Sequence, residues 1–147
     1  MTEQDLQVYL NTHIPLTQAM QIQVLSIASD QLILQAPLAP NKNPHHTVFG
    51  GSIATILTLA AWSLVHTRLE AEAISSTLVV RRSALEYQRP VEGDFAAKAY
   101  FADPTQWESF KQTLQTKGKA KIAVEAVIDY AGQVSAQFNG EFVALQV

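Results

Sequence analysis

The sequence predicts an α+β domain in which a curved antiparallel sheet wraps around one long, buried helix. An uncharged segment follows the pair Gly50-Gly51 and reaches Thr67. A helix this apolar cannot be covered on one side only. Near the C-terminus, two runs of strictly alternating apolar and polar residues are typical of antiparallel strands with one solvated face.

Composition bounds the classes of function. The chain has 147 residues, of which 48% are hydrophobic and 16% charged, so we expect one globular domain over residues 1–147. The net charge of −3 gives no support for binding nucleic acid or an anionic membrane. The absence of cysteine excludes disulfides, thiolate metal sites and cysteine nucleophiles. No signal peptide is recognisable in the acidic N-terminus, which favours a cytoplasmic location.

Helix-capping residues and prolines predict the helices, strands and loop of the first half of the chain. Thr2 caps a short helix that Pro15 ends. Branched residues predict a hairpin of two strands, 21–27 and 31–36, and three prolines then hold a loop that leads to Gly50. The apolar core of the next helix, residues 53–65, is shorter than a membrane span, so a buried core helix is expected.

The second half is predicted as four strands with one inserted helix. Residues 74–89 form a long strand, and residues 95–102 are expected to be its antiparallel partner. Asp103-Pro104 starts a helix that Gly118 stops. The alternating runs 120–130 and 134–142 form the last two strands, across a turn at 131–132.

The buried helix carries a polar stripe. On a helical wheel its polar residues fall within an arc of about 140°, namely Ser52, Thr55, Thr58, Trp62, Ser63 and His66. One interpretation is that the hydroxyls bond back to carbonyls of the helix and fill space. The other is that the stripe lines a pocket with Thr58 at the reacting centre.

This arrangement resembles the hotdog fold of acyl-thioester enzymes. Many small hotdog thioesterases carry an asparagine, a glycine three residues on, then histidine-glycine-glycine, then an acid about two turns into the helix. Asn43 and Gly50-Gly51 match this pattern, whereas His46 replaces the first glycine and Phe49 the histidine. Thr58 stands where the catalytic acid would be.

Over nearly its full length the chain resembles a bacterial hotdog family labelled "putative thioesterase", most specifically over residues 41–62. Some relatives are described as malonyl-ACP decarboxylases. The resemblance implies an acyl thioester of coenzyme A (CoA) or of acyl carrier protein (ACP) as substrate. It also implies a homodimer or a dimer of dimers with the tunnel at the subunit interface. No cofactor is expected, because the substrate itself carries CoA or phosphopantetheine.

The predicted site combines the helix start with the polar stripe. The predicted catalytic residues are Asn43, Gly51, Ser52 and Thr58. The predicted substrate-binding residues are His46, Phe49, Gly50, Thr55, Trp62, Arg81 and Arg82. No metal is expected, because four scattered histidines without cysteine form no recognisable ligand set.

Three functions stay open from the sequence. Hydrolysis needs a general base, for which the helix offers no carboxylate before Glu70, leaving His45, His46 or His66. Decarboxylation of a malonyl thioester needs an oxyanion site instead, which backbone N–H groups around Gly51 and Ser52 could supply, with Asn43 donating an amide hydrogen bond. Thr58 could then hold the substrate carboxylate or a water that delivers a proton. The third function is acyl binding without catalysis. Arg81, Arg82 and Arg89 either protect a strand edge or meet an anionic carrier.

Overall fold

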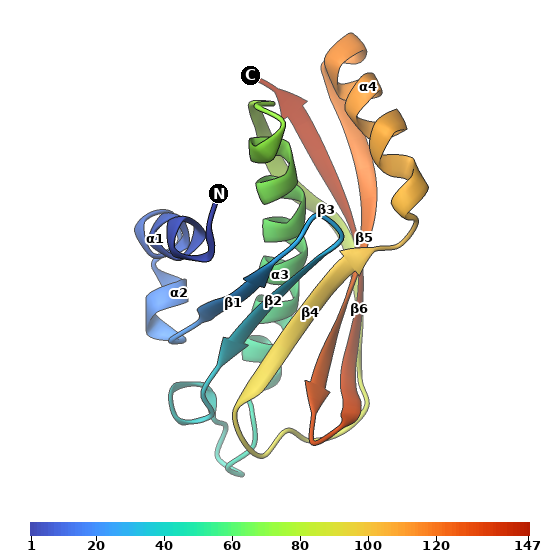
Figure 1. Cartoon of the computed structure of the whole chain (residues 1–147). Coiled ribbons are helices and arrows are strands. Elements are labelled where there is room, and N and C mark those ends of the chain that lie inside the picture. Colours follow the sequence, from blue (N-terminus) through green and yellow to red (C-terminus); the bar gives the residue numbers. More distant parts are fainter.

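A computed structural model describes residues 1–147 as one sheet with four helices (Figure 1). The helices are α1 (Glu3–His13), α2 (Leu16–Ala19), α3 (Gly50–Ala71) and α4 (Trp107–Lys117), with 3-10 turns η1 (Ala39–Asn41) and η2 (Pro104–Gln106). The strands are β1 (Gln23–Ile27), β2 (Gln31–Ala36), β3 (Ser76–Tyr87), β4 (Phe95–Phe101), β5 (Lys119–Tyr130) and β6 (Gln133–Gln146). None of the helices has the length and hydropathy to cross a membrane.

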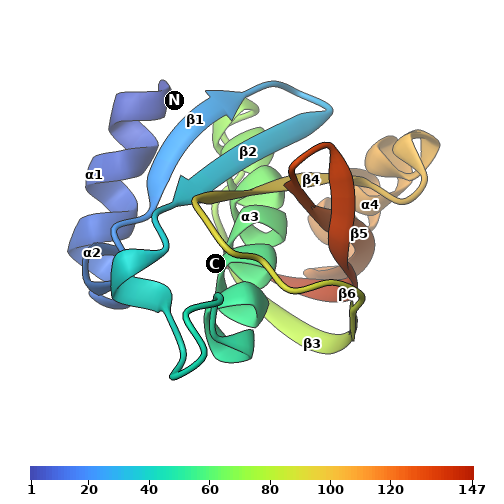
Figure 2. The same cartoon turned by 90° about the horizontal axis from the view of Figure 1, so that it is seen from below.

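The sheet is antiparallel with the order β1-β2-β4-β5-β6-β3, and its inner face curves around α3 (Figure 2). Eleven side chains of α3 are buried, including Leu57, Ala60 and Leu64, which are fully inaccessible to solvent. α1 and α2 cover the helix on the side of β1 (Figure 2). The predicted α+β architecture with a wrapped central helix is confirmed.

The predicted pairing of residues 95–102 with residues 74–89 is wrong. β4 pairs with β2 and β5, whereas β3 pairs with β6 at the far edge of the sheet. After β3 the N–H groups of Gln88 and Arg89 both donate to the carbonyl oxygen of Ser135, which keeps the chain beside β6. Val48 N–H then bonds to the carbonyl oxygen of Val91, at 2.8 Å, at the start of α3. This connection crosses one end of the fold, so β4 lies beside β2.

The two edges of the sheet differ. At β1, the side chain of Gln7 from α1 pairs with the backbone like a strand: its Nε2 donates to Ile22 O at 2.9 Å and its Oε1 accepts from Val24 N at 2.8 Å. β3 has no such cover. Of its twelve residues only Leu78 is buried. β3 is therefore a long, open edge, which proteins usually pair or protect.

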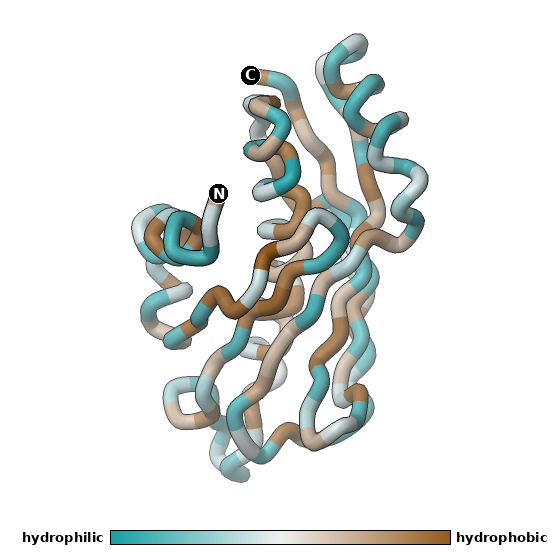
Figure 3. The backbone as a smooth tube through the Cα atoms, viewed as in Figure 1, coloured by the Kyte–Doolittle hydropathy of each residue, from teal (hydrophilic) through white to brown (hydrophobic).

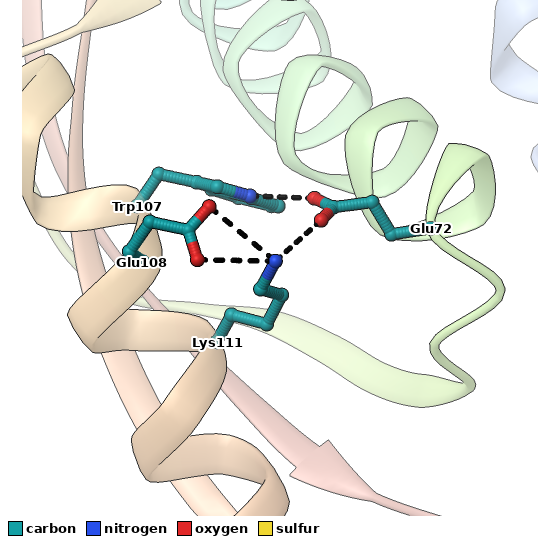
Figure 4. Close-up of polar contacts among 4 residues, drawn as sticks. All are labelled: Glu72, Trp107, Glu108 and Lys111. Atoms are coloured by element: carbon teal, nitrogen blue, oxygen red, sulfur yellow. Dashed lines mark hydrogen bonds and ion pairs between the residues drawn. The ribbon is translucent and has the colours of Figure 1, made fainter.

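A polar junction joins the end of α3 to α4 (Figure 4). The Glu72 carboxylate accepts from Trp107 Nε1 and from Lys111 Nζ, both at 2.6 Å. The Arg68 guanidinium lies 4.5 Å from the centre of the Trp107 ring. The Lys111 hydrogen bond, then the Trp107 hydrogen bond and the nearby cations, lower the pKa of Glu72 from its ordinary 4.5.

Replacing Glu72 by glutamine should lower the free energy of unfolding at pH 7 and flatten its acid dependence. Because the folded-state pKa is depressed, the carboxylate contributes stability above pH 4.5 that is lost as the pH falls through the folded-state value. The difference between wild type and Glu72→Gln in urea unfolding should therefore shrink below pH 4.5. Glu86→Gln, at an exposed carboxylate without a hydrogen-bond partner, is the control. A difference that does not change with pH would contradict this assignment.

Candidate active site

The start of α3 presents two backbone N–H groups without acceptors. Phe49 O already accepts from Ser52 N at 2.9 Å and from Ile53 N at 3.1 Å. The N–H groups of Gly50 and Gly51 have no partner, and they lie at the positive end of a 22-residue helix. An anionic oxygen can bind there. The predicted backbone role of Ser52 is not supported, because its N–H is already bonded.

Asn43 is engaged within its own loop. Its Oδ1 accepts from His45 N at 2.9 Å and from Thr47 N at 3.2 Å, and its Nδ2 donates to Thr47 Oγ1 at 2.8 Å. It does not line the hollow that contains Thr58. The predicted pocket shared by Asn43 and Thr58 is therefore absent from a single protomer. The amide closes the loop that positions the helix start.

His46 and Phe49 also belong to this loop. His46 has φ of 62°, a left-handed conformation that favours glycine, which explains why a glycine suits this position of the motif. Both His45 and His46 are exposed, and neither lines a hollow described below. The Phe49 ring is 56% exposed and lies over Gly51, where a side chain would collide with it. Glycine at position 51 therefore makes room for the Phe49 ring.

A hollow of about 210 Å³ lies between α3 and the inner face of β3 and β6. It brings together three residues of the predicted stripe, Thr55, Thr58 and Trp62. Its other walls are Ile14, Leu59, Val80 and Phe142. Ile14, Val80 and Phe142 were not predicted, because they come from three distant segments with no common sequence signal. We call this space the Thr58 hollow.

The Thr58 hollow contains hydroxyls but no acid or base. Thr58 Oγ1 donates to Ala54 O at 2.8 Å, and Thr55 Oγ1 donates to Gly51 O at 2.9 Å. The expectation that these hydroxyls bond back to the helix is thus confirmed, although both residues also line the hollow. Since each hydroxyl has one hydrogen, what remains free is its lone pairs, which accept hydrogen bonds. None of the lining residues has a carboxylate or an imidazole.

His66 lies behind this hollow rather than in it. Its ring stacks on Trp62 with centroids 4.6 Å apart and on Tyr9 at 4.7 Å. Trp62 is fixed in turn by a 2.8 Å bond from its Nε1 to Leu78 O. Burial lowers the pKa of His66 from 6.5, partly offset by the charge of Glu70, and its buried Nε2 has no hydrogen-bond partner. His66 therefore supports the wall of the hollow as a neutral ring.

Acid should lower the free energy of unfolding through His66. Because the folded-state pKa lies below 6.5, the unfolded chain takes up a proton first, and stability falls as the pH drops below 6.5. His66→Phe keeps the ring stack but cannot ionise, so its unfolding free energy should lose this dependence between pH 6.5 and 5. Urea unfolding of wild type, His66→Phe and the exposed-site control His45→Phe measures it. Equal acid dependence in wild type and His66→Phe would contradict the assignment.

Arg81 and Arg82, predicted to meet the phosphates of CoA or an acidic carrier surface, do not line the Thr58 hollow. A bulge between Val80 and Arg82 interrupts the alternation of β3. Val80 pairs with Phe142 on the inner face, whereas Arg82 pairs with Glu141 and Arg81 bonds to the same carboxylate on the outer face. The sheet thus separates both arginines from Thr58.

Arg89, unlike Arg81 and Arg82, lies near the helix start. It lines a hollow of about 330 Å³ together with Gly50, Tyr87 and neighbouring loop residues. The Tyr87 ring approaches Gly50, and its hydroxyl reaches Gly50 O at 3.4 Å. A cation and a free backbone N–H therefore border one space at the start of α3.

Comparison with known proteins assigns the family. A family model described as "Putative thioesterase" matches residues 3–146. The chain belongs to this family. A crystal structure of a "putative thioesterase" from Shewanella oneidensis is 32% identical, with a TM-score of 0.86, covering 97% of this chain and 96% of that one. A protein of unknown function from Chlorobaculum tepidum is 31% identical, with a TM-score of 0.94, covering 99% and 94%.

A more distant thioesterase from Haemophilus influenzae shares the fold alone, at 12% identity and a TM-score of 0.79 over 99% of this chain and 92% of that one. The hotdog fold predicted from the sequence is confirmed by these neighbours. Membership of the thioesterase family is likewise confirmed.

Proposed function

We propose that this thioesterase-family protein decarboxylates malonyl thioesters, carried by ACP or CoA, to acetyl thioesters. The observation that carries the proposal is the lining of the Thr58 hollow, which is apolar with two hydroxyls and has no carboxylate or imidazole. Hydrolysis needs a base to activate water. Decarboxylation needs a stabilised oxyanion and a proton, and a nearby carboxylate would repel the malonyl group.

The chemistry uses groups that the structure leaves free. The bond between C2 and the carboxylate breaks, carbon dioxide leaves, and the electron pair forms a thioester enolate. The Gly51 N–H, at the positive helix end, stabilises the enolate oxygen. The apolar wall of Val80 and Phe142 disfavours the substrate carboxylate relative to neutral carbon dioxide. A water that donates a hydrogen bond to Thr58 Oγ1 delivers a proton to C2 and is reprotonated from bulk solvent, so one proton is consumed overall and the acetyl thioester forms.

This mechanism requires two copies of the chain. Gly51 and Thr58 lie on one face of α3, but seven residues at about 1.5 Å each separate them by about 10 Å. A malonyl group is too short to meet both on one helix. A second copy can bring its own Gly51 to this Thr58. The open edge of β3, with Val79 and Val80 48% and 43% exposed, supports pairing between copies there.

Thioester hydrolysis is the second candidate, favoured by the family's description and by the Shewanella oneidensis relative. Its base would have to come from outside the Thr58 hollow. Binding of acyl thioesters without catalysis is the third candidate, for which the missing acid is the supporting observation.

Incubation of the protein with malonyl-CoA that is labelled in its free carboxyl group distinguishes the three candidate functions. Decarboxylation releases labelled carbon dioxide with no free thiol, and hydrolysis releases free thiol with the label retained in malonate. Binding alone raises the melting temperature without either product. Release of thiol, or no turnover with either CoA or ACP as carrier, would overturn the proposal.

A further inference from the structure

A hollow larger than the two at α3 lies away from the proposed active site. β4 ends at Phe101, opposite Val124, so the first half of β5 has no strand on that side. α4 lies alongside it instead (Figure 1). Between α4 and the outer face of β5, β6 and β3 a groove of about 730 Å³ remains. This volume is within the range of small-molecule sites. We call it the α4 groove.

The α4 groove is cationic in an acidic protein. Lys119 and Lys121 of β5 line it from one strand and Arg81 of β3 from another. Its one carboxylate is Glu141, which is already paired with Arg81. Three cations and one carboxylate leave a formal charge of +2, whereas the whole chain carries −3. Neither lysine forms an ion pair.

The floor and the opposite wall of the groove have different chemistry. On the floor of the groove, Val143 lies opposite Lys121 and Ala123 lies opposite Glu141. Phe110 of α4 adds an apolar surface. Ser109 and Thr113, also on α4, line the groove, and neither side chain has a hydrogen-bond partner. Cations, an apolar floor and free hydroxyls therefore surround one space.

We propose that the α4 groove binds a phosphorylated ligand with an apolar ring, of the nucleotide class. Lys119, Lys121 and Arg81 pair with the phosphates, because ammonium and guanidinium groups form strong charge-assisted bonds to them. The base lies over the exposed Ala123, bordered by Phe110 and Val143, which are 4% and 7% exposed, and the α4 hydroxyls reach the ribose.

The ligand lies across the sheet from Thr58, so this site is distinct from the thioester site of the same protomer. Two sources share this chemistry: a free nucleotide and the nucleotide end of CoA.

Calorimetric titration of the whole chain with ADP tests the proposal. ADP should bind in a saturable way, more tightly than adenosine or inorganic phosphate alone, and more weakly as salt increases. The double variant Lys119→Gln, Lys121→Gln should weaken ADP binding at least about tenfold, since two charge-assisted contacts are lost. Lys98→Gln, on the neighbouring strand β4 and outside the groove, should bind like wild type. Thermal unfolding confirms that each variant folds.

Titration with CoA identifies the source. Tighter binding of CoA than of ADP, again lost in the double variant, supports the nucleotide end of CoA; equal or weaker binding supports a free nucleotide. Absence of saturable ADP binding, or equal ADP binding by wild type and double variant, would overturn the proposal. Displacement of ADP by an acyl pantetheine, which lacks the nucleotide, would also overturn the proposal. The same holds if the double variant loses binding of an acidic protein such as ACP but not of ADP. The readout is binding, so these results are independent of turnover.

Discussion

Replacing Thr58 by valine is expected to lower kcat for a malonyl thioester about 100-fold, the usual effect of losing a group that positions a transferred proton. Valine has the shape of threonine without its oxygen, so the Thr58 hollow keeps its walls. The hydroxyl donates to Ala54 O within the helix, and that carbonyl remains part of the helical backbone. The melting temperature should therefore change little.

Thr58→Ser is the matched control, because it keeps the oxygen and loses only a methyl group. It should retain most of the wild-type kcat. The ratio of the two variants separates the role of the hydroxyl from that of packing. Equal activity of Thr58→Val and wild type would remove Thr58 from the reaction and leave only its structural bond to Ala54.

The second large effect is recovery of activity when two inactive variants are combined. Thr58→Leu fills the Thr58 hollow, and Gly51→Val places a branched side chain beside the free N–H and against the Phe49 ring. Each variant alone should lose nearly all turnover. If one site takes Gly51 from one protomer and Thr58 from its partner, half of the dimers in an equal mixture are mixed, and each has one intact site. The mixture should then regain about a quarter of wild-type activity.

Coexpression of the two variants with different tags, followed by turnover assays, measures this recovery. Light scattering on wild type supplies the mass of the assembly. A mixed preparation as inactive as its parents would show that each protomer supplies both groups to its own site. A wild-type protein that is monomeric and active would contradict the shared site.

Much of the fold follows from local patterns. The uncharged run after Gly51 could only be a buried helix, and the alternation in β5 and β6 fixed which side chains face it. Alternation identifies faces but not partners, however. The sequence therefore predicts that β4 pairs with its neighbour β3, whereas the bonds of Gln88 and Arg89 to Ser135 hold the chain after β3 beside β6.

The candidate site was predictable only where it lies on one helix. Thr55, Thr58 and Trp62 follow from the helical period and do share a hollow. The bulge in β3 has no signature in the pattern of apolar and polar residues. That pattern therefore does not predict that Arg82 lies on the outer face of the sheet. The loop bonds that occupy Asn43 depend on a turn conformation that residue identity alone does not specify.

In the proposed reaction this protein removes the free carboxyl of a malonyl thioester and leaves the thioester bond intact. Mass spectrometry of malonyl-ACP after incubation with the protein tests it most directly, with the Thr58→Val variant run beside wild type. Wild type should form acetyl-ACP, lighter than the substrate by one carbon dioxide, and the variant should form much less. Accumulation of holo-ACP, with the acyl group lost, would rule out decarboxylation and show hydrolysis.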